Sequence, residues 1–358
     1  MYIEGKIKTG KKTKELVKYL DKWDIALINH NDIDELAALS ILNTGVRCVL
    51  NTGCCMTGRY ESKGTSILIR NGVLLYDIAL SFDLFNDNDR ISIANKDIVI
   101  EGKGIHYNVC TPVNEEYIIL KTEKSRKNAK SELNAFIDNT ITHALRDKEY
   151  LLSDNYYPDL NTELFNKHVL VVARGAGCEN QLLMIKDYIK YQNPVIIGVD
   201  GGADILLNFG LIPDILIGDM DSVSDIGIYK SREIILHAYS SGYCPCLERI
   251  EKMNVKYKLL PMPGTSEDIA LLLAYDMGAE LITLVGGHAC MEDFLEKGRN
   301  GMGSTLLTRI KVGNKLVDVK GISKLLPVFS LNSSIYGGST TSYESECYKE
   351  RDRLCMKM

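Results

Sequence analysis

From His168 onward the chain alternates short apolar runs with segments of helical spacing, and this alternation constrains the fold more than any other feature. The runs are nearly continuous in Val, Ile and Leu, which is typical of strands buried on both faces of a parallel sheet. The pattern predicts an α/β fold with a doubly wound, largely parallel sheet. The expected strands are HVLVVA, PVIIGV, DILIG, EIILHAY, YKLLP, LITLVGG and KLVDVK, and the expected helices are ENQLLMIKDYIKY, GADILLNFG, CLERIEKM, SEDIALLLAYDMG and GSTLLTRIK.

The preceding part, residues 1–122, predicts a smaller, β-rich α/β domain. We expect strands in DIALINH and RCVLNT, and a helix in DIDELAALSILNTG that Asp32 caps and Gly45 ends. SILIRNGVLLYDI reads as short strand-like pieces, and the alternating isoleucines of RISIANKDIVIEGKGIHY indicate a hairpin. The basic stretch KTGKKTKELVK near the N-terminus is interpreted as a solvated flank.

Two further regions complete the expected organisation. Residues 123–160 predict a connecting helix and a linker: the charged stretch KTEKSRKNAKSE comes first, and apolar residues at helical spacing follow from Leu133 to about Leu152. The sheet domain covers 161–326. The tail, 327–358, is rich in Ser, Thr and Gly and then charged, so we expect it to be disordered.

Composition limits the function classes. The chain has 358 residues and a formal net charge of -5, which argues against a nucleic-acid partner. Its ten cysteines include no CxxC pair and no zinc-like spacing, so we interpret them as reduced thiols. The sequence has no signal-peptide pattern and no apolar run long enough to cross a membrane. We therefore expect a cytoplasmic protein.

The turn in PDILIGDMDS predicts a metal site. Its apolar run stops at Gly218, and Asp219 and Asp221 follow one residue apart. Two carboxylates this close raise each other's free energy unless a cation lies between them. Carboxylate oxygens suit Mg²⁺, which uses one or two protein carboxylates together with phosphates. The alternative is an acidic N-cap for the segment that begins at Ser222.

Other polar turns follow predicted strands. In GVDGGAD, Asp200 precedes Gly201 and Gly202 at a helix start, where backbone N–H groups can approach an anion, although a plain tight turn explains the glycines equally well. In PGTSEDIALLLA, helix capping accounts for the polar residues without a ligand. In VGGHACMEDFLEKGRNGMGST, Arg299 and the glycines suit phosphate, whereas His288 is interpreted as structural.

The ordered set VDGGADILLNFGLIPDILIGDMDS resembles the signature of the thiamine pyrophosphokinase catalytic domain, over about Val169 to Val319. The resemblance implies catalytic roles for Asp200, Asp219 and Asp221, with Mg²⁺ at Asp219 and Asp221 and ATP or a related nucleotide as ligand. It implies nucleotide binding at Gly201, Gly202, Asp219, Asp221, Ser222, Thr265, Ser266, Asp268, Gly286 and Gly287. The chain departs from that family where Thr-Asp becomes Thr265-Ser266 and where Gly-Gly-Arg becomes Gly286-Gly287-His288.

Nearly the whole chain up to Leu326 resembles the SteA family, on the stretches GRNGMGSTLLTRIKVGNKLVDVKGISKL, DIALINHNDIDELAA and TGRY. This resemblance implies a bacterial cytokinetic-ring protein that binds a Mg-nucleotide or related phosphate ligand and engages cell-division partners. Dimers among the pyrophosphokinases imply a homodimer. The family carries an apolar, membrane-associating C-terminus that this tail lacks, so we expect a shortening or frameshift after Leu326.

Two other functions remain open at this stage. The first is an active enzyme that transfers pyrophosphate from Mg-ATP to thiamine, giving AMP and thiamine diphosphate. The second is a structural protein with a relic site, in which Asp219 and Asp221 form only a solvated turn. The altered motifs at Ser266 and His288 favour a ligand-binding or scaffold protein over the enzyme, whereas a relic site leaves Asp219 and Asp221 unexplained except as a solvated turn.

Overall fold

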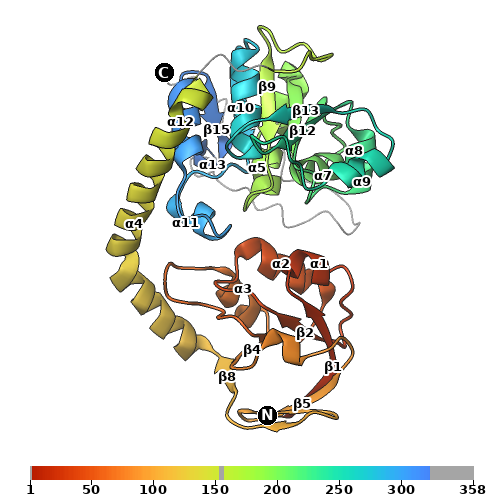
Figure 1. The fold of residues 1–358 in the computed structure, drawn as a ribbon, viewed down its shortest axis with the longest axis vertical. Coiled ribbons are helices and arrows are strands. Elements are labelled where there is room, and N and C mark those ends of the chain that lie inside the picture. The colour runs from red at the N-terminus through yellow and green to blue at the C-terminus, as the bar shows by residue number, and fades with distance from the viewer. Residues whose placement is uncertain (1, 153–156, 323–358) are drawn as a thin grey trace, which may run out of the picture. The chain divides into compact units, whose positions relative to one another are not determined.

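The computed structural model describes residues 2–152 and 157–322. The described residues up to Lys320 belong to the first of two compact units of the chain. The predicted tail at 327–358 lies outside the described residues. Within the described part of the first unit the strands make two sheets, one N-terminal and one C-terminal in sequence (Figure 1).

The C-terminal sheet has the strand order β13-β12-β11-β10-β9-β14-β15 among the described residues. Each pair of neighbouring strands runs parallel, as the alternating pattern predicted. The strands are β9 (His168–Val172), β10 (Val195–Val199), β11 (Ile215–Gly218), β12 (Glu233–Ala238), β13 (Lys258–Pro261), β14 (Leu281–Val285) and β15 (Leu316–Asp318).

Helices cover both faces of this sheet, which confirms the doubly wound fold. Val169 and Val171 pack with the apolar side of α10 (Ser266–Asp276), whereas the alternate residues Leu170 and Val172 pack with α5 and α7 on the opposite face. The other helices of this part are α5 (Cys178–Met184), α6 (Lys186–Gln192), α7 (Gly202–Asn208), α8 (Asp225–Lys230), α9 (Leu247–Lys252), α11 (Met291–Leu295), α12 (Gly303–Val312) and α13 (Val319–Ile322). The single helix expected in ENQLLMIKDYIKY is divided into α5 and α6 at Ile185.

The path of the chain through the sheet creates a switch point. From β9 the chain moves outward strand by strand to β13, and it then returns to place β14 on the other side of β9. In open parallel sheets, ligands bind beyond the carboxyl ends of the strands near such a reversal. We therefore expect a ligand site at the turns that follow β9, β10, β11 and β14.

The N-terminal sheet is mixed, with the order β7-β6-β5-β1-β2-β3-β4-β8 among the described residues. Its strands are β1 (Tyr2–Gly10), β2 (Ile25–Ile28), β3 (Cys48–Asn51), β4 (Leu74–Ile78), β5 (Arg90–Ala94), β6 (Asp97–Ile100), β7 (Gly104–His106) and β8 (Cys110–Val113). Its helical segments are α1 (Thr13–Leu16), α2 (Glu35–Thr44), α3 (Gly64–Arg70) and the 3-10 turn η1 (Phe82–Leu84). The predicted hairpin is confirmed, because β5 pairs antiparallel with β6 and Ile93 lies opposite Ile98.

Three expectations for this region are wrong. The N-cap of α2 is Asp34 rather than Asp32, because the Asp34 side chain accepts from the N–H of Ala37. The stretch interpreted as a solvated flank contributes to β1 and α1, and β1 joins β2 in parallel and β5 in antiparallel pairing. The run that read as strand-like in SILIR belongs to α3, with Leu68 fully buried. Short apolar runs suit either element, and tertiary packing decides between them.

The connecting helix α4 (Glu115–Leu152) is longer than predicted. It starts before the charged stretch KTEKSRKNAKSE, which lies inside the helix, and it contacts α3 and α12. Only the second half of α4 was predicted as a helix, because only there do apolar residues repeat at helical spacing. Residues 153–156 of the expected linker lie outside the described residues.

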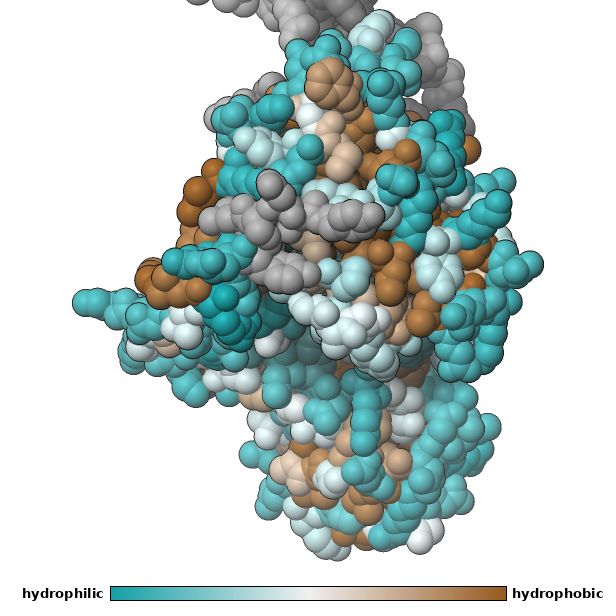
Figure 2. Space-filling view, turned by 45° about the horizontal axis from the view of Figure 1, so that its top comes forward, coloured by the Kyte–Doolittle hydropathy of each residue, from teal (hydrophilic) through white to brown (hydrophobic). Residues whose placement is uncertain are grey.

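The surface is mostly hydrophilic on the face shown in Figure 2, where apolar residues occur in small groups among polar ones. In the described ranges, no helix has both the length and the apolar character needed to cross a membrane. The cysteines that the structure describes are all free thiols.

Candidate functional site

Polar side chains gather where four neighbouring strands of the C-terminal sheet end. Asp200 follows β10, Asp219 follows β11, and His237 is the last residue but one of β12. Ser266 begins α10, a few residues after β13. Because the four strands are parallel neighbours, their carboxyl ends lie along one edge of the sheet. This edge is the candidate functional site.

The backbone holds Asp200 in an unusual conformation. Asp200 and Met220 both have positive φ angles, 47° and 64°, a left-handed conformation that non-glycine residues rarely adopt. The N–H of Met220 donates to Asp200 Oδ1 over 3.2 Å. Gly218 is required beside them, because a Cβ there would lie 1.8 Å from Asp200 Oδ1. The fold thus brings the Asp200 carboxyl directly over the end of β11.

The Asp200 carboxyl is electrostatically strained. Burial, and then the nearby charge of Asp219, raise its pKa to about 7, against the opposing effect of the Met220 N–H and Ser266. Removal from water and a neighbouring like charge both favour the protonated acid. A cation beside the two carboxylates would relieve both effects. The site therefore has the electrostatics that favour a bound cation.

The other two predicted aspartates are more open than Asp200. Asp219 is half-buried and its Oδ1 accepts from the backbone N–H of Asp221 over 3.0 Å. Asp221 is exposed, and its Oδ2 accepts from Lys14 Nζ over 2.7 Å. One oxygen of Asp221 is thus already paired, whereas the charge of Asp219 acts on Asp200.

An arginine fixes the turn that carries these carboxylates. Arg249 of α9 donates from Nη1 to the carbonyl of Met220 over 2.7 Å and from Nη2 to the carbonyl of Val223 over 2.9 Å. Its guanidinium also pairs with Asp225. Two charge-assisted hydrogen bonds to backbone carbonyls restrict the turn more strongly than a surface ion pair does.

The donor set fits Mg²⁺ only together with a ligand. Among the described residues no three His, Cys, Asp or Glu side chains are grouped so that they could hold a metal ion. Asp200 and Asp219 supply hard oxygen donors, which suit Mg²⁺ rather than a soft metal. Because Mg²⁺ is commonly bound by one or two carboxylates plus phosphate oxygens and water, the arrangement suits a metal that arrives with a phosphate ligand.

The predicted glycines next to Asp200 have packing roles. A Cβ on Gly202 would lie 2.1 Å from the carbonyl of Val172, so glycine lets α7 approach β9 closely. The N–H of Gly201 donates to Ser222 Oγ over 3.3 Å, which joins the two predicted turns. Helix α7 has only seven residues, so its dipole alone makes a weak anion site.

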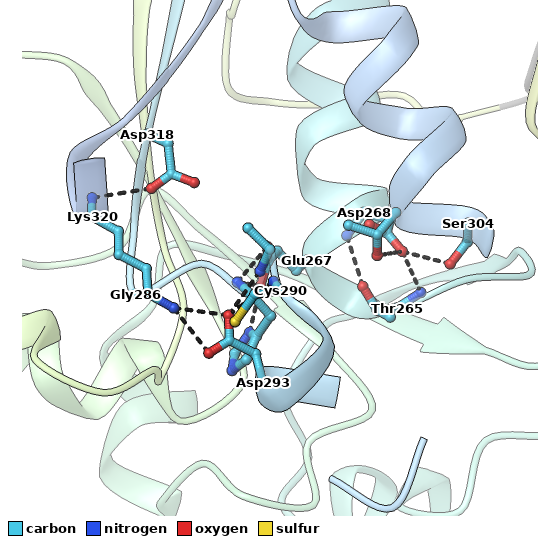
Figure 3. A network of polar contacts seen from close by, with 12 residues as sticks. Thr265, Glu267, Asp268, Gly286, Cys290, Asp293, Ser304, Asp318 and Lys320 are labelled. Atoms are coloured by element: carbon cyan, nitrogen blue, oxygen red, sulfur yellow. Dashed lines mark hydrogen bonds and ion pairs between the residues drawn. The ribbon is translucent and has the colours of Figure 1, made fainter. Parts of the chain in front are cut away.

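Thr265 and Asp268 are held by capping contacts at the start of α10. The Thr265 side chain accepts from the N–H of Asp268, and Asp268 accepts from the N–H of Thr265, which makes a capping box. Asp268 Oδ2 also accepts from Ser304 Oγ over 2.7 Å and from Thr305 Oγ1 over 3.1 Å (Figure 3). These contacts account for Thr265 and for one oxygen of Asp268 without a ligand, whereas Asp268 Oδ1 is buried with no hydrogen-bond partner among the described residues. The nucleotide-binding role of both residues stays a prediction.

A second network surrounds the end of β14. Glu267 is buried, and its carboxylate lies 2.8 Å from His288 Nδ1, which confirms a structural partner for that histidine. Gly286 has φ 67° and a Cβ there would lie 2.1 Å from the carbonyl of Ala173. Figure 3 shows this region, including the Asp293 carboxylate that pairs with Lys320. The glycine is needed for close packing, and its ligand role stays a prediction.

Sequence reasoning missed His237. Its Nε2 lies 2.9 Å from the carbonyl of Met262, and its Nδ1 lies 3.1 Å from Ser266 Oγ. In the sequence it is one polar residue within the apolar run EIILHAY. The signal that could have found it is its place at a strand end, in register with the polar residues that end β10 and β11.

Two cations also lie within electrostatic reach of the site. The charge of Arg299 adds to the effect of burial in lowering the pKa of His237. The charges of Glu267 and Asp200 oppose the lowering of the pKa of Lys297 by burial. Lys297 keeps an exposed side chain, but the protein packed around its ammonium group lowers its pKa. Both residues precede α12, in the glycine-rich connection that the sequence indicated for phosphate.

The fold and this edge define an α/β protein with a carboxyl-end site. No family model matches the sequence, and no curated protein matches it. One solved structure that it is similar to is thiamine pyrophosphokinase from Bacillus subtilis, at 24% sequence identity and a TM-score of 0.28. The likeness covers 42% of this chain and 60% of that one. At this level the likeness carries no argument about ligand or activity.

Proposed function

We propose that this chain binds a Mg-bound nucleotide or a related phosphate ligand at the carboxyl ends of β10 and β11. The observation that carries the proposal is the half-buried Asp200 at the end of β10, whose carboxyl accepts from the Met220 N–H and whose pKa is raised to about 7 by burial and by the charge of Asp219. A folded protein that keeps two acids this close without a cation gives up stability. A divalent cation would recover it.

The ligand's phosphate would complete the metal's coordination. Asp200 and Asp219 would provide the protein oxygens, and phosphate and water would supply the remaining ligands. The charges of Arg299 and Lys297 act on His237 and on Asp200, so positive charge is available near the aspartates for a phosphate. Mg²⁺ would neutralise charge on the phosphate and orient it, while the residues of the turn hold the complex in register.

The SteA-type role in cell division is part of the same proposal and rests on the sequence motifs alone. In that role the bound nucleotide would be a regulatory ligand, and the N-terminal sheet domain would engage division partners. Asp219 and Asp200, which follow β11 and β10, would then bind the ligand through its metal ion.

A second candidate is an active Mg-dependent pyrophosphoryl transferase that makes AMP from ATP, with thiamine as acceptor. The observation that favours it is a carboxyl whose pKa of about 7 suits proton transfer at neutral pH, beside an imidazole–hydroxyl pair. An acceptor hydroxyl would attack the β-phosphorus, its proton would go to Asp200, and AMP would leave.

Calorimetry tests the binding proposal. Titration of the full chain with ATP should give heat only when Mg²⁺ is present, and Asp219→Asn should weaken binding at least tenfold. Asp187→Asn, an exposed carboxylate in the first turn of α6, is the matched control and should bind like the wild type. Binding that is independent of Mg²⁺, or unchanged in Asp219→Asn, would overturn the site.

An assay of AMP release separates the two candidates. Thiamine-dependent AMP formation, lost in Asp200→Asn, would establish the transferase. Tight Mg-dependent binding with no AMP would leave the ligand-binding function.

A further inference from the structure

We propose that Tyr239 and Tyr243, an exposed and stacked pair just past β12, bind the flat aromatic base of the nucleotide whose phosphates the proposed metal site holds. The inference deepens the proposed function and rests on it for the metal–phosphate part of the ligand. It adds a second contact surface, because the two aspartates account only for the charged end of a nucleotide.

The two tyrosine rings are parallel to within 3°, and their centroids lie 6.1 Å apart. The side chains of Tyr239 and Tyr243 are each 64% exposed, although aromatic rings gain free energy when they leave water. Aromatic groups prefer to meet one another as parallel stacked or edge-to-face rings. The pair thus offers a flat ligand two ring surfaces with one common orientation, and a ligand that stacks on them removes apolar surface from water.

The tyrosine turn, residues 239–243, holds this pair in place. The N–H of Tyr239 donates to the carbonyl of Tyr243 over 2.9 Å, and the N–H of Gly242 donates to the carbonyl of Tyr239 over 2.7 Å. Gly242 has φ 82°, a left-handed conformation that glycine adopts without strain. Because these bonds already order the backbone of the turn, a ligand that stacks on the rings loses less free energy to ordering the protein.

The tyrosine turn lies at the same edge of the sheet as the acidic residues. Strand β12 pairs in parallel with β11, and Leu236 is opposite Gly218, so the chain leaves both strands in the same direction. Asp219 directly follows Gly218, and Tyr239 is the first residue after β12 ends at Ala238. The base site and the proposed metal site therefore follow neighbouring strands.

Electrostatics place the far end of the tyrosine turn near the same carboxylates. Cys244 directly follows Tyr243, and burial is the first cause of the raised pKa of its thiol. The charges of Asp219 and Asp200 raise that pKa further, so both carboxylates lie within electrostatic reach of this residue. A nucleotide carries its base several bonds away from its phosphates. A base site beside the acidic residues, rather than among them, is what such a ligand requires.

The surroundings of the pair favour a flat ring over an aliphatic group. Ser240 and Ser241, between the two tyrosines, are small, polar and exposed, so they add no apolar wall. Apolar ligands without a flat face are bound in concave, mostly apolar pockets. Stacking needs only an open aromatic face, and every nucleobase has one to offer.

Adenosine, which has a base but no phosphate, tests the aromatic contact by itself. In NMR titrations with adenosine we expect the ring signals of Tyr239 and Tyr243 to shift upfield, because a stacked base shields them; Tyr239→Phe and Tyr243→Phe assign these signals. Tyr191 on α6 is the control, since it is 75% exposed and lies before the amino end of β10. No shift at the pair, or equal shifts at Tyr191, would overturn the inference.

Calorimetry with two ligands tests the link to the phosphate site. Mg-ATP carries a base, and Mg-tripolyphosphate carries phosphates without one. Tyr243→Leu should weaken the binding of Mg-ATP about tenfold, because stacking is lost, and should leave the affinity for Mg-tripolyphosphate unchanged. Tyr243→Phe keeps an aromatic ring, and Tyr191→Leu removes an exposed ring elsewhere, so both should bind the two ligands as the wild type does.

The remaining outcomes separate this inference from the proposed function. Wild-type affinity for Mg-ATP in Tyr243→Leu, or an equal loss for both ligands, would contradict a base-stacking role while the metal site stands. If neither ligand binds to the wild type, the proposed function fails, and the adenosine titration still decides whether the tyrosine pair binds a base.

Discussion

Asp200 and Met220 face each other across the ends of β10 and β11, and the Met220 N–H donates to Asp200 Oδ1 over 3.2 Å. Both residues are left-handed, at φ 47° and 64°, and neither is a glycine. Such a backbone costs on the order of 1–3 kcal/mol at each residue and persists only where the surroundings impose it. Here the left-handed backbone fixes the Asp200 carboxyl within electrostatic reach of Asp219.

Gly218→Ala should remove ligand binding. The added Cβ would lie 1.8 Å from Asp200 Oδ1, so the carboxyl must move, and we expect a loss of about 1–3 kcal/mol in the free energy of unfolding as well. Urea unfolding and calorimetry with Mg-ATP give the two values. Gly210→Ala is the control, because its Cβ meets open space at φ 72°; it should lose about 1–2 kcal/mol and bind normally. Equal affinities in the two variants would contradict the role of Asp200.

Stability should depend on pH through Asp200. Its folded pKa, about 7, is above the unfolded value of 3.8, so the folded state binds more protons between these values. The Asp200 contribution is therefore fully present below about pH 4 and is lost as pH rises through 7. Asp200→Asn mimics the protonated acid, so the variant should gain stability relative to the wild type as pH rises from 5 to 8.

The difference between Asp200→Asn and the wild type is the quantity to measure, by urea unfolding across that range. Glu296 also has a pKa raised to about 7, chiefly by burial, and it contributes the same trend to both proteins. A stability difference that does not change with pH would mean that Asp200 keeps an ordinary pKa.

Arg249→Met should loosen the acidic turn. It removes the donors to the carbonyls of Met220 and Val223, and we expect a loss of about 2 kcal/mol in stability and a weaker affinity for Mg-ATP. Arg232→Met is the matched control, because Arg232 pairs with Asp214 near the start of β11. It should leave affinity unchanged. If both variants bind equally well, the clamp does not position the carboxylates.

Asp268→Ala should reduce stability rather than affinity. Asp268 is fully buried and accepts from the Thr265 N–H, Ser304 and Thr305, so its loss removes a cap and leaves donors unpaired. We expect a loss of about 2–3 kcal/mol in the free energy of unfolding, with Mg-ATP affinity within about threefold of the wild type. A tenfold loss of affinity in the folded variant would instead support the nucleotide contact that the family resemblance implies.

The parallel sheet could be predicted because its strands are buried on both faces and read as continuous apolar runs. Strand β1 could not, since its antiparallel pairing with β5 joins segments far apart in the chain and its own residues alternate weakly. The start of α4 was missed because its first half has no apolar repeat, and α3 was mistaken for a strand because SILIR is too short to show a period.

The part of the site that follows directly from the strand order could also be predicted. Asp200 and Asp219 follow predicted strands, and the parallel order alone brings their ends together. Helix capping at Thr265 or Ser266 was predicted from the sequence as an alternative to ligand binding, and the structure shows a capping box of Thr265 and Asp268. His237 was not predicted, because its partner carbonyl, Met262, lies on another segment and a carbonyl leaves no mark in a sequence.

A crystal structure of the full chain soaked with Mn²⁺ and ATP tests the central claim most directly, because the anomalous signal of manganese locates the ion independently of the nucleotide. The predicted result is an ion bound by carboxylate oxygens of Asp219 and Asp200 and by phosphate oxygens of the nucleotide. Nucleotide bound elsewhere, or an ion that touches neither aspartate, would contradict the claim that this edge of the sheet is a metal–phosphate site.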